Sequence, residues 1–205
     1  MDVLFSTNNS KKFEQVKVVL NHPDIDLYTL KDAGIEGAAV EDGKTLEENA
    51  AKKSWFAWRN PAKGSKWHRA YIISEDTGLF IDALDGKPGI DTAEWPGPGI
   101  RGIAVRDYAI KQILTISESE RGATWRTVAT LREPSGNYFE RHGRLRGHLI
   151  IEPRGTFMEE LPYSQLFVPD GYDKTLAELI DAGTPVETHR TGAFEQIREL
   201  LLERL

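Results

Sequence analysis

Two adjacent carboxylates, Glu75 and Asp76, follow the short apolar run 70–73, which we expect to be a strand. Neighbouring carboxylates beside a buried strand repel each other and lose hydration unless a cation lies near both. Carboxylate oxygens are the ligands that Mg²⁺ prefers, and Mg²⁺ in turn binds substrate phosphates. Neighbours in a strand point to opposite faces, so a shared site requires the chain to twist in the polar turn that we expect at 74–78. A metal site and a solvated acidic turn are equally compatible with these residues.

A second polar turn, 6–10, follows another short apolar run and is followed by Lys11 and Lys12. Hydroxyls, amides and a lysine at the start of a helix suit a phosphate group. The same residue types are ordinary helix caps and surface residues. Taken alone, this segment favours capping, although its position after a strand is where open sheets place ligands.

Further charged residues lie where they could assist such a site. Glu41 lies in a loop of small and acidic residues, and Lys53 lies one turn into the helix that follows. His189 and Arg190 precede the last expected helix, where Arg190 could bind a planar group or a phosphate. Each is more often a solvated or structural residue. Together they suggest a metal-dependent enzyme that handles phosphates.

The hydrophobic pattern alternates strands and helices early and pairs strands in the middle, which predicts an α/β domain with a mixed sheet. Thr45 followed by Glu48 is a helix-start signature, and 134–137 reads as a hairpin turn. Expected strands cover 3–5, 26–30, 70–73, 123–131 and 137–151. Expected helices cover 13–20, 45–58, 103–116, 174–180 and 193–205. The segment 85–102 is expected to be a long ordered loop or a lid.

Composition limits the classes of protein that remain. The chain has 205 residues, of which 40% are apolar and five are Trp, and its net charge is −6. Such a chain is not a disordered acidic polymer, and its apolar runs are shorter than a membrane span. We expect one domain, 1–205, without disulfides or thiol chemistry because Cys is absent. No secretory signal is recognised, so we expect a cytoplasmic protein with neither nucleic acid nor a membrane as its partner.

Five blocks, in order along the chain, resemble the inosine triphosphate pyrophosphatase family. The turn 6–12 is similar to the family's T-G-N-x-x-K turn, and 45–53 is similar to its T-F-x-E-N-A helix and lysine. The segment 75–89 resembles D-D-S-G-L…A-L-G-G-x-P-G. The next block matches in 153–155, 167–169 and 175–179, and the tripeptide 188–190 stands where the family has S-H-R.

The resemblance implies hydrolysis of a nucleoside triphosphate to the monophosphate and pyrophosphate, with Mg²⁺. It also implies an elongated mixed β-sheet flanked by helices, two lobes with an active-site cleft between them, and a homodimer. Asp76 would be the general base that orients water at the α-phosphorus. The implied metal ligands are Glu41, Glu75 and Asp76. The implied triphosphate ligands are Thr7, Asn9, Lys12 and Lys53, and Thr77 keeps the hydroxyl of the family's Ser.

The base-recognition segment departs from the family. The family's F-G-[YW]-D-P is 161–165 here, so Leu161 replaces Phe and Ser164 replaces Asp. Other departures are the acidic segment 158–160, Thr184 for a lysine, Asn8 for a glycine and Glu94 for a common Arg. The remaining expected base contacts are Tyr163, His189 and Arg190.

The resemblance favours ITP, dITP and XTP as substrates. Because the base segment diverges, the same chemistry on a different modified or standard nucleotide stays open. A nucleotide-binding protein with little turnover, and a phosphohydrolase that acts on monophosphates or other pyrophosphate bonds, are weaker alternatives.

Overall fold

The computed structural model describes all residues, 1–205, and the chain forms two compact units. Unit 1 comprises Met1–Thr77, Thr127–Gly143 and His189–Leu205, and unit 2 comprises Gly78–Arg126 and Arg144–Thr188. The strands are β1 (Asp2–Phe5), β2 (Asp26–Thr29), β3 (Tyr71–Ile81), β4 (Pro88–Gly89), β5 (Gly122–Arg132), β6 (Tyr138–Leu149) and β7 (Phe167–Pro169). The α-helices are α1 (Ser10–Val19), α2 (Leu46–Arg59), α3 (Ile103–Ile113), α4 (Leu176–Asp181) and α5 (His189–Leu202).

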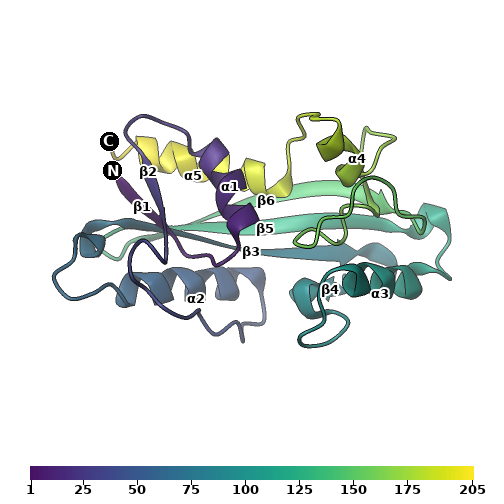
Figure 1. Cartoon of the computed structure of the whole chain (residues 1–205), viewed down its shortest axis with the longest axis horizontal. Helices are drawn as coiled ribbons and strands as arrows, with labels where there is room; N and C mark the ends of the chain where they lie inside the picture. Colours follow the sequence, from purple (N-terminus) through teal and green to yellow (C-terminus); the bar gives the residue numbers. More distant parts are fainter. The chain divides into compact units, whose positions relative to one another are not determined.

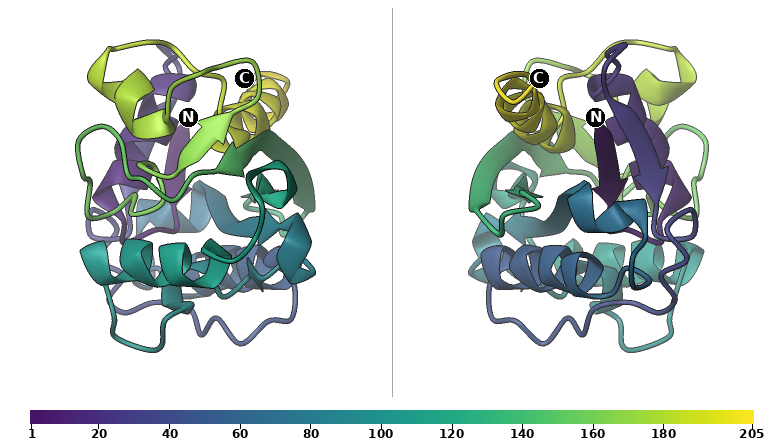
Figure 2. Two further views of the ribbon diagram at one scale, coloured as in Figure 1. Left: turned by 90° about the vertical axis from the view of Figure 1, so that its right-hand side faces the viewer. Right: turned by 90° about the vertical axis from the view of Figure 1, so that its left-hand side faces the viewer.

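Unit 1 is a sheet with helices on both faces. β1 pairs in parallel with β2 and β3, and β5 and β6 are joined by the short turn at 133–137. Figures 1 and 2 show α1 and α5 on one side of these strands and α2 on the other. Odd-numbered strand residues such as Phe5 and Ile73 pack with α1 and α5, whereas Leu4 and Ile72 pack with α2. This alternation decides where the polar residues further along β3 point.

Unit 2 also has helices on both faces of its strands. β4 pairs antiparallel with β3, and β7 pairs antiparallel with β6. Figures 1 and 2 show α3 on one side of these strands and α4 on the other. α3 buries Val105, Ala109 and Ile113 against a cluster that includes Leu79 and Ile81. The parallel pairs of unit 1 and the antiparallel pairs of unit 2 confirm the predicted α/β class with a mixed sheet.

Several predicted elements are confirmed. α2 begins after Thr45, whose side chain accepts a hydrogen bond from the Glu48 amide at 3.1 Å. The hairpin turn lies at 133–137, between β5 and β6. The segment 85–102 is largely loop, with β4 and one 3-10 turn within it.

Three predicted boundaries near the site are wrong. α1 begins at Ser10 rather than at 13, so Lys11 and Lys12 lie in its first turn. β3 does not end at 73, because it continues through Glu75 and Asp76 to Ile81. α5 begins at His189 rather than at 193, so His189 and Arg190 form its first turn. A Cβ added at Gly143 of β6 would lie 1.8 Å from the His189 carbonyl oxygen, so the missing side chain lets the helix start pack directly on the strand. Tertiary packing therefore extends the helix beyond its hydrophobic pattern.

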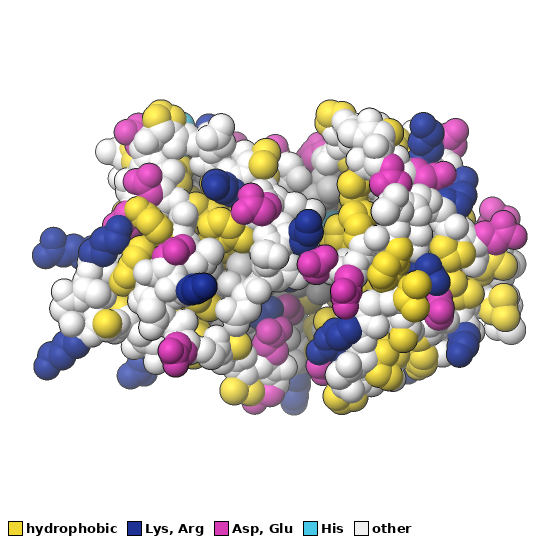
Figure 3. Space-filling view, viewed as in Figure 1, with side chains coloured by type: hydrophobic (Ala, Val, Ile, Leu, Met, Phe, Trp, Pro, Cys, Tyr) yellow, Lys and Arg dark blue, Asp and Glu magenta, His cyan; other side chains and the backbone are white.

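The surface carries both signs of charge. On the face shown in Figure 3, acidic and basic side chains lie interspersed among apolar and neutral ones. This face therefore shows no single field of acidic side chains. None of the helices is both long and apolar enough to span a bilayer.

Candidate active site

Glu75 and Asp76 point to opposite faces of the sheet of unit 1. Both are almost fully buried, and they lie inside β3 rather than in a turn after it. Glu75 follows the odd-numbered pattern toward α1 and α5, and Asp76 follows the even-numbered pattern toward α2. The prediction that the chain turns at 74–78, and so brings both carboxylates into one site, is therefore wrong. Each acid instead has its own set of partners.

Glu75 is held by two cations from two helices. Its Oε1 lies 2.8 Å from the Lys12 Nζ of α1, and its Oε2 accepts a hydrogen bond of 2.8 Å from the Arg190 Nε of α5. Burial alone would raise the pKa of Glu75, but Arg190 and Lys12 outweigh it and hold that pKa well below its ordinary value. The Arg190 Nη1 also donates to the Oε1 of Gln15 at 2.6 Å. Glu75 is therefore ionised at neutral pH.

Asp76 is held from the α2 side. Its Oδ1 lies 2.7 Å from the Lys53 Nζ, which also lies 2.8 Å from the Oε2 of Glu41. Its Oδ2 accepts a hydrogen bond from the Asn49 amide at 3.3 Å. Burial raises the pKa of Asp76, and Lys53 offsets only part of that effect. For Lys53, burial lowers the pKa, but Asp76 and Glu41 together outweigh it and raise the value.

The turn between β1 and α1 is shaped by its own side chains. Asn9 is the N-cap of α1, and its Oδ1 accepts a hydrogen bond from the Lys12 amide at 3.0 Å. The Thr7 hydroxyl accepts from the Asn9 amide at 3.1 Å. The capping role that these residue types favour is thus present. The same geometry leaves the start of α1 beside Lys12, with its amides and partial positive charge.

Thr77 and His189 also lie in unit 1. The Thr77 hydroxyl shares a hydrogen bond of 2.7 Å with the hydroxyl of Thr127 and lies 3.4 Å from the Glu75 carboxylate. His189 is buried, and burial, with the nearby positive charge of Arg190, lowers its pKa to about 3. His189 is therefore a neutral imidazole over the physiological pH range.

Tyr163 is the predicted site residue that belongs to unit 2. It is 3% exposed, and its hydroxyl donates to the Thr92 carbonyl at 2.7 Å. Its ring contacts Trp125 edge to face, and burial raises the pKa of the phenol. These contacts make Tyr163 part of the core of unit 2, and its contact with a base stays a prediction. Ser164, which replaces the family's Asp, donates to the Leu161 carbonyl at 2.7 Å.

Three acids of unit 1 are the predicted metal ligands. Glu41, Glu75 and Asp76 offer the hard oxygen atoms that suit Mg²⁺. No group of three or more His, Cys, Asp or Glu side chains is placed so that it could hold a metal ion by itself. Each of the three acids is paired with a cation instead. Mg²⁺ is commonly held by one or two carboxylates together with substrate phosphates. The residues fit that mode of binding.

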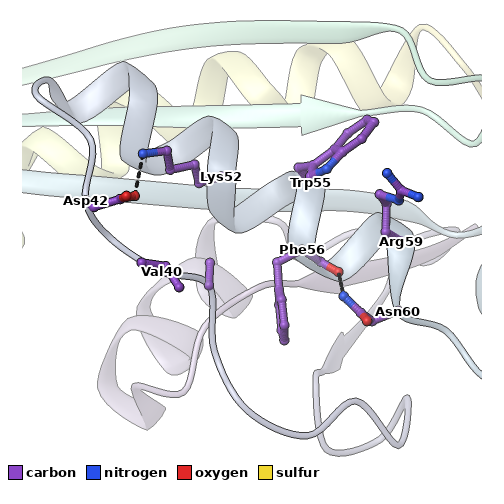
Figure 4. Close-up of a pocket in the computed structure, with 8 residues that line it drawn as sticks. Val40, Asp42, Lys52, Trp55, Phe56, Arg59 and Asn60 are labelled. Carbon is purple, nitrogen blue, oxygen red and sulfur yellow. Dashed lines mark hydrogen bonds and ion pairs between the residues drawn. The ribbon is translucent and has the colours of Figure 1, made fainter.

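A separate pocket of about 510 Å³ lies on the outer side of α2. Figure 4 shows that it lies between α2 and the loop that carries Val40 and Asp42, with Asp42 paired to Lys52. Trp55 and Arg59 form part of its wall, and the guanidinium lies 5.2 Å from the Trp55 ring. The pocket is lined by none of the predicted site residues.

Two residues that contact the predicted site residues were not themselves predicted from the sequence. Asn49 binds Asp76, and Gln15 binds Arg190. Asn49 stands inside the block that resembles T-F-x-E-N-A, so a signal for it existed. Gln15 lies on a polar stretch of α1 with no distinguishing motif, and only the fold brings it to Arg190.

Comparison with known proteins places this arrangement in a family. A sequence model of the Ham1 family matches residues 3–200. The "dITP/XTP pyrophosphatase" of Corynebacterium efficiens is 31% identical, over 99% of this chain and 98% of the relative. That of Thermoanaerobacter pseudethanolicus is 29% identical, over 100% and 98%. The structure of a HAM1 protein from Coxiella burnetii has the same fold, with a TM-score of 0.82 at 23% identity over 99% of each chain. The chain belongs to the Ham1 family, which confirms the resemblance of its five sequence blocks.

Proposed function

We propose that this protein hydrolyses non-standard purine nucleoside triphosphates, such as ITP, dITP and XTP, to the monophosphate and pyrophosphate. The observation that carries the proposal is the buried Asp76 carboxylate, held by Lys53 on one oxygen and by Asn49 on the other. The relatives named dITP/XTP pyrophosphatase match along the whole chain. Because the family match covers parts of both units, we propose that 1–205 acts as one domain.

Asp76 is the proposed general base. Its pKa is raised above the usual value of a carboxylic acid, so its carboxylate is a better proton acceptor than an ordinary exposed Asp. Lys53 fixes its orientation and favours its ionised form. In this role Asp76 takes a proton from a water molecule that attacks the α-phosphorus, and pyrophosphate leaves.

The triphosphate is proposed to bind at the start of α1. Lys12 and Lys53 supply charge, and Thr7 and Asn9 shape the turn whose amides face the phosphates. The three cations Lys12, Lys53 and Arg190 are balanced by three carboxylates. A triphosphate therefore needs further positive charge in order to bind this neutral cluster.

A divalent cation meets that need. Because Glu75 and Asp76 point to opposite faces, Mg²⁺ would take one of them as a direct ligand and reach the other, like Glu41, directly or through water, and it would neutralise charge on the phosphoryl oxygens. Lys12 contacts Glu75 in this structure. A metal at Glu75 would take over part of this pairing and leave Lys12 for the phosphates.

Base recognition is proposed for His189 and Arg190 of unit 1, with Thr77 beside the phosphates, and the contact of Tyr163 with a base stays a prediction. Arg190 uses Nε for Glu75 and Nη1 for Gln15, which leaves Nη2 as the donor for an oxo group of a base. A site that hydrogen-bonds such a group rejects bases that lack it. Because Ser164 and Thr184 replace a charged Asp and Lys of the family pattern, discrimination is proposed to be weaker than in its relatives.

We propose a cytoplasmic location, because the substrate is the free nucleotide pool and not nucleic acid. We also propose a homodimer. In support of a dimer, three apolar side chains in or beside α3 are solvent-exposed: Ile100, Ile103 and Leu114. Light scattering after size-exclusion chromatography tests this point. A mass of one chain at all concentrations overturns it.

A panel of standard, deaminated and modified triphosphates with Mg²⁺, read out as pyrophosphate, tests the function. The proposal predicts the highest kcat/KM for 6-oxo purines such as dITP and XTP. Release of orthophosphate alone would favour a different phosphohydrolase. Tight nucleotide binding without any product would favour a binding protein.

A further inference from the structure

Asn49 makes two hydrogen bonds that join separate parts of unit 1. It lies in the first turn of α2 and is 4% exposed. Its Oδ1 accepts a hydrogen bond from the Gly43 amide at 2.8 Å, and its Nδ2 donates to the Oδ2 of Asp76 at 3.3 Å. One side-chain amide thus connects the loop before α2 with the middle of β3. A side-chain amide carries its acceptor and its donors on two separate atoms, so it can accept from a backbone amide and donate to a carboxylate at the same time.

The loop that Asn49 holds carries Glu41. Three successive loop residues contact α2: Glu41 with Lys53, Asp42 with Lys52, and Gly43 with Asn49. Both acids of the first two pairs are at least half exposed, and such ion pairs contribute little to stability and are screened by salt. The hydrogen bond to Asn49 is partly buried, so it is less exposed to water and salt than the pair of Asp42 with Lys52.

Gly43 is required for this contact by space rather than by backbone conformation. A Cβ added there would lie 2.5 Å from the Oδ1 of Asn49 and 2.9 Å from the Cβ of Glu48. Its φ lies outside the left-handed region. A side chain at 43 would therefore displace the Asn49 amide from the loop without altering Asn49 itself.

Asp76 is oriented by two donors on its two oxygens. Lys53 binds Oδ1 and Asn49 binds Oδ2. Lys53 also binds Glu41, and Asn49 also binds Gly43, two residues further along the same loop. Asp76 is therefore joined to the loop that carries Glu41 by two side chains of α2, the charged Lys53 and the neutral Asn49.

We propose that Asn49 is a positioning residue that keeps the Asp76 carboxylate and the Glu41 loop in register. The inference rests on the proposed function for its effect on turnover, but the loop contact is independent of that function. A small displacement of a reacting group can cost about 100-fold in rate. Loss of Asn49 is expected to lower kcat more than it raises KM, because three of the four proposed phosphate ligands, Thr7, Asn9 and Lys12, lie at the start of α1 rather than on α2.

The test uses two variants of the full chain and one control. Asn49→Leu removes both hydrogen bonds at similar volume, and Gly43→Ala displaces the amide from the loop side. Ser54→Ala is the control, since Ser54 is buried in the same helix and its hydroxyl donates to the Ala51 carbonyl. Hydrogen exchange of the Gly43 amide is measured alongside the kcat and KM for pyrophosphate release from dITP.

The expected result is that Asn49→Leu and Gly43→Ala each lower kcat by about 10-fold to 100-fold, with KM changed less than kcat. Each should also speed exchange of the backbone amide at position 43. Ser54→Ala should keep the wild-type kcat and the wild-type exchange at Gly43. The proposal is overturned if both variants keep the wild-type kcat, or if Gly43 stays protected in Asn49→Leu. If the wild type releases no pyrophosphate, the proposed function fails, while the exchange data still decide whether Asn49 holds the loop. If Asn49→Leu does not fold, Gly43→Ala alone decides.

Discussion

Arg190 donates a hydrogen bond of 2.8 Å from Nε to the Oε2 of Glu75, and both side chains are buried. The two residues are 115 positions apart, so the contact joins the start of α5 to the middle of β3. Lys12 binds the other oxygen of Glu75 from α1. Arg190 is therefore a partner of an acid in addition to its predicted role at the base.

Removing Arg190 should destabilise the fold. Arg190→Met leaves Glu75 buried with Lys12 as its remaining cation, and breaking a buried ion pair typically costs about 3–5 kcal/mol. We expect the free energy of unfolding in urea to fall by about 3 kcal/mol, the lower end of that range. The double variant Glu75→Gln with Arg190→Met should lose less than the sum of the two single variants. Strict additivity would show that the contact is not coupled.

Lys53 should set the pH dependence of turnover. Lys53→Met removes the charge that favours ionised Asp76, so the pKa of Asp76 rises further. Because the base must be ionised, activity is lost as pH falls through that pKa, and the acid limb of the kcat profile should move to higher pH. Lys52→Met is the matched control, since Lys52 pairs with the exposed Asp42. An unmoved acid limb in Lys53→Met, or an equal shift in Lys52→Met, contradicts this assignment.

His189 should make stability depend on pH. Its pKa is lowered from 6.5 to about 3 in the folded chain, mainly by burial. The unfolded chain binds this proton near pH 6.5 and the folded chain does not, so the free energy of unfolding falls as pH drops from about 6.5 toward about 3. The slope from one such group approaches about 1.4 kcal/mol per pH unit. In urea titrations between pH 7 and 5, His189→Gln should show a shallower slope than the wild type. Equal slopes would mean that His189 is not the buried neutral group.

The sequence predicted the parts of this fold that local patterns control. Thr45 marks the start of α2, and the turn at 134–137 marks the hairpin, because capping and turn chemistry are local. Sequence did not predict that β3 continues through Glu75 and Asp76, since charged residues normally end a buried strand. They are tolerated there because Lys12, Arg190 and Lys53 arrive from three different helices.

The site was predicted as a set of residues and not as an arrangement. The resemblance to the family predicted Lys12, Lys53, Glu75 and Asp76 as site residues, and in the structure all four lie in unit 1. The opposite faces of the two acids follow from strand alternation, once the strand is known to extend that far. Gln15 carried no signal because its only distinguishing feature is its contact with Arg190 across 175 residues.

The most direct test of the central claim is hydrolysis of dITP in ¹⁸O-water with Mg²⁺, followed by mass spectrometry of both products, for the wild type and for Asp76→Asn. The wild type should give one ¹⁸O atom in dIMP and none in pyrophosphate, because water attacks the α-phosphorus. Asp76→Asn should fold normally and be slower by about 100-fold or more, the usual contribution of a general base. Label in pyrophosphate, release of orthophosphate, or full activity of Asp76→Asn would contradict this mechanism.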